Sequence, residues 1–198
     1  MAHMEPLPES ELTRFEGVFA AMEGVMGFVP NSLKTMARRP GLVNAFAQLA
    51  LETGQRGSVD PALKQLVGLV ASKAAGCMYC QAHLTTTSKR LDVPPEKIAA
   101  VWEYETSPLF DEAERAALRF ANHAALVPNA ATRSDFDALG RHFSEAEIVE
   151  ILATVCLFRW LNCWNDTMST TLEDLPKRDA EAHLTNTTWE LGKHHSAG

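Results

Sequence analysis

The stretch DPALKQLVGLVASKAAGCMYCQAH, residues 60–83, decides the fold because it contains a complete helix, a break and the start of a second helix. Asp60 is a good N-cap, and Pro61 suits the first position of a helix. Apolar residues then recur at intervals of three and four, which is the spacing of one buried helix face. These residues are Leu63, Leu66, Val67 and Val70. Gly76 ends or kinks this helix, and Cys77 opens the next one.

The same helical spacing recurs along the rest of the chain. Ser144 and Glu147 form a capping box before the longest predicted helix, which covers about residues 145–172. Alternation of apolar and polar residues with a period of two never lasts beyond a few residues, so no strand is predicted. The sequence therefore predicts an all-α fold.

Nothing in the sequence divides the chain, so we predict one domain over residues 1–198, with the core around the cysteine motif at about 59–130. Residues 1–3 look like an expression remnant. Residues 185–198 form a polar tail, which we expect to be partly disordered unless a partner chain holds it.

Charge and hydropathy argue against several classes of partner. The formal net charge is −7 at pH 7, the sequence pI is 5.5, and there is no basic run, so neither nucleic acid nor a membrane is expected as a partner. No segment approaches the roughly 18 apolar residues that span a bilayer, and the N-terminus lacks a secretion signal. We therefore expect a cytoplasmic protein whose four cysteines are thiols rather than a disulfide framework.

The cysteine motif places three reactive side chains together. Cys77, Cys80 and His83 are spaced by three residues, so they share one face of the second helix. Cys77 lies at a helix start, where free backbone N–H groups and the helix dipole favour a thiolate. His83 can take a proton from Cys80 or stabilise its thiolate. The group therefore contains a nucleophile, a second thiol that can close a disulfide, and a base.

Other interpretations of the cysteines remain open. The pair can be small core residues, with a histidine that hydrogen-bonds a carbonyl group, or part of a zinc site that needs four ligands. Cys156 and Cys163 are spaced too widely for a zinc-ribbon pair, so we expect them in the helix core. In LNCWNDT, residues 161–167, Trp164 stands beside Asn165 and Asp166, and we interpret it as a buried aromatic residue next to polar capping groups rather than as part of a site.

Four segments together carry a family resemblance. They are residues 60–83, GFVPNSLKTMARRPGLVNAFAQL upstream, LNCWNDTMSTTLE downstream, and TTWELGKHH near the end. With these segments the chain resembles the alkylhydroperoxidase D-like (AhpD-like), peroxidase-related proteins of the carboxymuconolactone decarboxylase superfamily. The resemblance implies an all-α, multi-helix bundle that forms a homo-oligomer. It also implies reduction of hydroperoxides, with an outside dithiol as electron donor and with no cofactor or metal ion.

The resemblance also implies roles for four residues. In this family the second cysteine of the motif attacks the peroxide, which makes Cys80 the nucleophile, Cys77 the resolving cysteine and His83 the base. Gln65 stands where the best-studied members carry a glutamate, and it can orient a histidine by hydrogen bonding. His83 follows Cys80 by three residues instead of the usual four. The alternative functions are a decarboxylase of a muconolactone-like acid, and a non-enzymatic helical oligomer or zinc-stabilised module.

Overall fold

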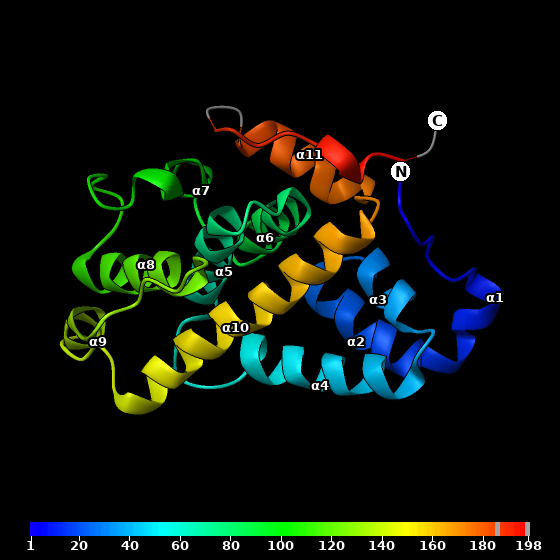
Figure 1. Cartoon of the computed structure of the whole chain (residues 1–198), viewed down its shortest axis with the longest axis horizontal. Helices are drawn as coiled ribbons and strands as arrows, with labels where there is room; N and C mark the ends of the chain where they lie inside the picture. The colour runs from blue at the N-terminus through cyan, green and yellow to red at the C-terminus, as the bar shows by residue number, and fades with distance from the viewer. Residues whose placement is uncertain (185–186, 197–198) are drawn as a thin grey trace.

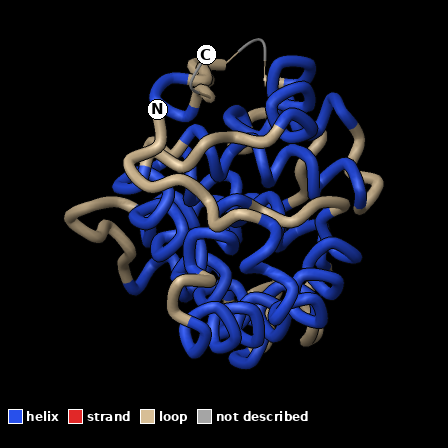
Figure 2. The backbone as a smooth tube through the Cα atoms, turned by 90° about the vertical axis from the view of Figure 1, so that its right-hand side faces the viewer, coloured by secondary structure: helices blue, strands red, loops and turns tan. Residues whose placement is uncertain are grey.

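The computed structural model describes residues 1–184 and 187–196, which form helices joined by turns and loops, with no strand in these ranges (Figure 1, Figure 2). The predicted all-α class is confirmed. The α-helices are α1 (Glu9–Leu12), α2 (Glu16–Met26), α3 (Asn31–Met36), α4 (Pro40–Gln55), α5 (Pro61–Ala74), α6 (Met78–Arg90), α7 (Pro95–Ala99), α8 (Glu112–Ala125), α9 (Arg133–Leu139), α10 (Glu145–Met168) and α11 (Asp174–His183). Three short 3-10 helices are η1 (Thr13–Phe15), η2 (Ala100–Glu103) and η3 (Gly192–His194).

The two helices of the opening stretch form the centre of the molecule. Asp60 caps α5 as predicted, because its carboxylate accepts a hydrogen bond from the backbone N–H of Ala62 at 2.8 Å. Every residue of α5 from Leu63 to Ser72 is buried, since α6, α8 and α10 all pack against this helix. The motif helix α6 therefore starts inside the molecule rather than on its surface.

The long helix α10 crosses the molecule diagonally and separates two apolar clusters (Figure 1). The larger cluster contains α5, α6 and α8, and the smaller one is built by α1 to α4. Ser144 and Glu147 form the predicted capping box at the start of α10. The helix ends at Met168, earlier than predicted, and Ser169 has a left-handed φ of 48°. The chain then turns and continues into α11, which packs on α6.

Part of the C-terminal segment, which we predicted to be a partly disordered tail unless a partner chain holds it, packs against the rest of this chain. Among its described residues, 187–196, the indole N–H of Trp189 donates a hydrogen bond to the carbonyl oxygen of Met78 at 2.9 Å. His194 is only 1% exposed, and its carbonyl oxygen accepts from the backbone N–H of Leu172 at 2.9 Å. Aromatic and histidine side chains thus tie this segment to the start of α6, which the polar composition of the tail did not indicate. Residues 185–186 and 197–198 lie outside the described residues.

Candidate active site

The turn between α5 and α6 gives the two cysteines different positions at the start of α6. Gly76 has a φ of 76°, the left-handed region that glycine enters without steric cost, and it reverses the chain directly before Cys77. Cys77 is the N-cap of α6, and its sulfur accepts a hydrogen bond from the backbone N–H of Cys80 at 3.4 Å. Cys80 therefore lies in the first turn of the helix, and Cys77 lies at its entrance, as the spacing predicted.

Cys80 opens onto a cavity of about 110 Å³ that lies where the two apolar clusters meet. His83 and Gln65 line the same cavity, so the structure brings three of the four predicted site residues together. Most of the wall is apolar: Met22, Val25, Met26, Pro30, Leu33, Phe46, Ala50, Leu84, Leu157, Phe158 and Leu161. Cys77 is fully buried and is not among the lining residues. Only one of the two motif thiols therefore faces a molecule bound in the cavity.

A side chain from α10 contacts the sulfur of Cys80. The amide nitrogen of Asn165 donates a hydrogen bond to Cys80 Sγ at 3.5 Å, and Asn165 itself is 1% exposed. A neutral donor aimed at the sulfur stabilises it when it carries negative charge, without adding a charge of its own. The sequence singled out LNCWNDT but favoured a structural role for it, and this contact shows that part of the segment belongs to the site.

Glu173 holds His83 in place. Its carboxylate lies 2.7 Å from His83 Nε2 and also accepts hydrogen bonds from the Tyr79 hydroxyl, at 2.9 Å, and from the backbone N–H of Asn31. The Tyr79 ring stacks on the imidazole with 4.1 Å between the ring centroids. Burial opposes ionisation of Glu173, but the charge and hydrogen bond of His83 and the backbone donor outweigh it and hold the pKa of Glu173 below its ordinary value.

This arrangement corrects the role predicted for Gln65. The side-chain oxygen of Gln65 accepts a hydrogen bond from the Thr87 hydroxyl at 2.7 Å, whereas the group that orients His83 is Glu173. The best-studied members of the family carry a glutamate twelve residues before the first cysteine, whereas here the carboxylate beside the histidine comes from the other end of the chain. The spacing of the motif could not link Glu173 to His83, because 90 residues separate them.

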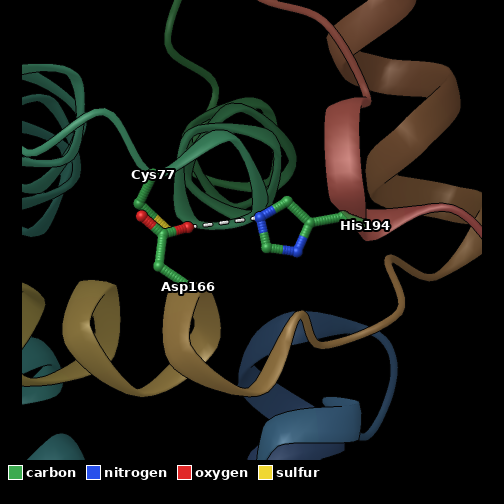
Figure 3. Close-up of side chains that lie close together, drawn as sticks. All are labelled: Cys77, Asp166 and His194. Carbon is green, nitrogen blue, oxygen red and sulfur yellow. Dashed lines mark ion pairs between the residues drawn. The ribbon is translucent and has the colours of Figure 1, made fainter. Parts of the chain in front are cut away.

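Cys77 faces a different set of groups, none of which lines the cavity. Its sulfur, a carboxylate oxygen of Asp166 and a ring nitrogen of His194 all lie within 4.8 Å of one another (Figure 3). Burial, then the neighbouring Cys80 and then the carboxylate of Asp166 raise the pKa of the Cys77 thiol well above its ordinary value. The expectation that the helix start makes Cys77 a ready thiolate is therefore wrong, because burial and a nearby negative charge outweigh the helix dipole.

The group of Cys77, Asp166 and His194 does not make a structural zinc site. It offers three donor atoms, whereas such a site takes four at tetrahedral positions. The remaining two cysteines do not belong to this group of donor atoms. Cys156 and Cys163 are both exposed on α10, so the prediction that they are core residues is wrong. A spacing of seven residues fixes a shared helix face, but it does not tell which face is buried.

Comparison with known proteins gives these residues a family. The family model "Carboxymuconolactone decarboxylase family" matches residues 40–123, which include the motif. This chain is 34% identical in sequence to a Cys-to-Ala variant of the debrominase Bmp8, whose crystal structure was determined in complex with 2,3,4-tribromopyrrole. The two structures superpose with a TM-score of 0.87 over 92% of this chain and 97% of that chain. The chain belongs to the carboxymuconolactone decarboxylase superfamily.

Two further members are more distant. A peroxidase-related protein from Ralstonia eutropha JMP134, described as an alkylhydroperoxidase AhpD core, is 23% identical with a TM-score of 0.72 over 86% of this chain and 88% of that one, which shows the shared fold. The uncharacterized Escherichia coli K12 protein YnjA is 26% identical over 103 residues. That match covers 52% of this chain and 57% of YnjA. The superfamily resemblance read from the motif is thus confirmed.

Proposed function

We propose that this chain is a dithiol-dependent reductase that removes a halogen from a small, apolar, halogenated aromatic compound. Cys80 is the nucleophile, Cys77 is the resolving cysteine, and His83 exchanges the proton. The observation that carries the proposal is the division of the two thiols, since Cys80 faces an apolar cavity while Cys77 is buried outside it. The 34% identity with the debrominase Bmp8 over nearly the whole chain supports the class of substrate.

The residues present suffice for a balanced two-electron reduction. The thiolate of Cys80 forms a bond to the halogen as the carbon–halogen bond breaks, and the carbon takes a proton from His83. The thiol of Cys77 then attacks the sulfur of Cys80, so that the halogen leaves as halide and a disulfide forms with loss of one proton. In the net reaction, the halogenated aromatic compound and two thiols become the dehalogenated compound, a disulfide, a proton and a halide ion. An outside dithiol restores the two thiols.

A hydroperoxide, predicted from the family resemblance, is the second candidate substrate. The same residues balance its reduction: Cys80 attacks the O–O bond, an alcohol leaves, and Cys77 converts the resulting sulfenic acid into the disulfide with loss of water. The specific observation in favour is the pair of His83 and Glu173, because an alkoxide leaving group needs a proton at once and His83 can carry one. The electron donor and the homo-oligomer stay predictions.

Single-turnover reactions test the proposal. Reduced protein with Cys156→Ser and Cys163→Ser, which removes the two exposed thiols, is mixed separately with a set of brominated pyrroles that includes 2,3,4-tribromopyrrole and with cumene hydroperoxide. Bromide release and peroxide loss are followed together with the thiol count. We expect one equivalent of product and the loss of two thiols for the preferred substrate.

Variants of the motif separate the two thiol roles. We expect Cys80→Ser to abolish the reaction, and Cys77→Ser to allow one attack on the substrate but no disulfide. Release of bromide or loss of peroxide at the same rate in Cys80→Ser and in the parent protein would refute the proposal. Faster reaction with the hydroperoxide than with every brominated pyrrole would select the second candidate.

A further inference from the structure

A second cluster of titratable groups surrounds Cys77, and none of its members lines the cavity. It joins Cys77 at the start of α6, Asp166 in the last turns of α10 and His194 in η3 (Figure 3). Cys77 is fully buried and His194 is 1% exposed. A buried histidine and a half-buried carboxylate placed against a buried thiol are more than packing requires, because burial of a polar group costs free energy.

A hydrogen bond fixes the orientation of the His194 ring. Its Nδ1 is 2.8 Å from the carbonyl oxygen of Thr170, and since a carbonyl only accepts, Nδ1 carries a hydrogen. Its Nε2 lies 3.3 Å from Asp166 Oδ1, and neither of these two buried atoms has another hydrogen-bond partner among the described residues. The imidazole and the carboxylate therefore lie against each other directly beside the Cys77 thiol.

The surrounding charges favour the ionised carboxylate. Burial opposes ionisation, but the contact with the His194 ring and the positive charge of Lys193 outweigh it and hold the pKa of Asp166 below its ordinary value. Lys193 Nζ lies 3.6 Å from Asp166 Oδ1, and the Tyr79 ring centroid is 5.7 Å from that of His194. The Asp166 side chain is 28% exposed, which leaves a path for a proton to reach water.

We propose that Asp166 is the general base for the resolving cysteine and that His194 is the residue that positions it, so that closing the disulfide depends on the C-terminal segment. The proposal rests on the proposed function for the roles of Cys77 and Cys80. Before the first step, the carboxylate keeps Cys77 as a thiol, so Cys80 alone reacts with substrate. After that step Asp166 accepts the proton of Cys77, the sulfur of Cys77 bonds to the sulfur of Cys80, and the group on Cys80 leaves with the bonding electrons.

A neutral disulfide reagent tests this step without any natural substrate. With 4,4′-dithiodipyridine, Cys80 first forms a mixed disulfide and releases one equivalent of 4-thiopyridone. Cys77 then attacks the mixed disulfide and releases the second equivalent, while its proton passes to Asp166. The two releases are followed by absorbance in the background with Cys156→Ser and Cys163→Ser. The first phase reports Cys80 and the intact cavity, and the second reports Cys77.

The variants are expected to act on the second phase only. We expect Asp166→Asn to slow it by about 100-fold at pH 7 and to make it rise tenfold per pH unit, because Cys77 must then lose its proton to water. We expect His194→Phe to slow it as well. His194→Gln, whose amide can donate to Asp166 without being titratable, should restore most of the rate. The exposed neighbour His195→Gln is the matched control and should leave both phases unchanged.

Several results would overturn the proposal. One is a second phase in Asp166→Asn that is as fast as in the parent protein or faster, which would mean that the carboxylate only suppresses the thiolate. Equal slowing in His194→Gln and His194→Phe, or slowing of the first phase too, would indicate a structural role. One equivalent of tightly bound metal in the reduced protein would also overturn it. If the protein reduced neither a brominated pyrrole nor a hydroperoxide, but still released 4-thiopyridone in two phases, only the proposed function would be refuted.

Discussion

The carboxylate of Glu173 offers the sharpest test of how the site is held together. Three donors converge on it in a buried position: the ring of His83, the hydroxyl of Tyr79 and the backbone N–H of Asn31. In Glu173→Gln one amide oxygen remains to accept, and the new NH2 group meets donors instead of acceptors. Hydrogen bonds to a charged group contribute about 1.5–3 kcal/mol each, so we expect a loss of about 2–4 kcal/mol in the free energy of unfolding at pH 7.

The loss should depend on pH with a definite sign. The pKa of Glu173 is held below its ordinary value of 4.5, so the folded state binds the proton less readily than the unfolded chain does. The stabilisation from the carboxylate is therefore complete above about pH 4.5 and disappears as the pH falls toward the lowered pKa. The difference between the parent protein and Glu173→Gln should be constant from pH 7 to pH 5.5 and should shrink below pH 4.5.

Urea unfolding at several pH values measures both effects. The neighbouring Asp174→Asn is a matched control, because Asp174 is an exposed carboxylate in the first turn of the same helix. Its loss should stay below about 1 kcal/mol, the usual size of a helix-dipole effect. A change of less than about 0.5 kcal/mol in Glu173→Gln at pH 7, the range of an ordinary surface substitution, would refute the reasoning. A loss that is the same at pH 4 as at pH 7 would refute it too.

Three further predictions concern packing and thiol reactivity. In Gly68→Ala the new Cβ would lie 2.6 Å from a ring atom of Phe158 in the cavity wall, so we expect a loss of about 1–3 kcal/mol in urea unfolding and weaker ligand binding. Brief alkylation of the native, reduced protein with iodoacetamide should label the two exposed cysteines of α10 before the two motif cysteines, by peptide mass spectrometry. The exchange Asn165→Asp with Asp166→Asn should lower the alkylation rate of Cys80 relative to the resolving thiol, and an unchanged ratio would contradict the assignment of these contacts.

The sequence predicted the parts of the fold and site that depend on near neighbours in the chain. The capping residues of α5 and α10 lie within three residues of the N–H groups that they bind, so Asp60 and Ser144 predicted where both helices start. The shared face of Cys80 and His83 follows from helix geometry alone. The end of α10 was predicted less well, since Ser169 leaves the helix through a left-handed conformation that its residue type does not favour.

The groups that tune the thiols could not be predicted in the same way. Glu173 and His194 reach the motif only because the chain turns back after α10, and although both lie in segments that carry the family resemblance, nothing in those segments indicates which side chain they contact. Gln65 in place of the family's glutamate indicated a difference around the histidine, but the sequence could not place the carboxylate of Glu173 there. A buried histidine in a polar C-terminal segment likewise has no local signature, because burial depends on what the rest of the fold places around it.

The two thiols differ because of two adjacent residues on α10. Cys77 is the N-cap of α6 and Cys80 lies in its first turn, so both sulfurs lie near the positive end of the helix dipole, which cannot decide which one reacts. Successive residues of a helix point about 100° apart, so Asn165 turns an amide donor toward Cys80 while Asp166 turns a carboxylate toward Cys77. A neutral donor stabilises negative charge on one sulfur, and a carboxylate opposes it on the other. In the function that we propose, the order of Asn and Asp in LNCWNDT therefore distinguishes the attacking cysteine from the resolving one, which the Cys-x-x-Cys spacing alone does not do.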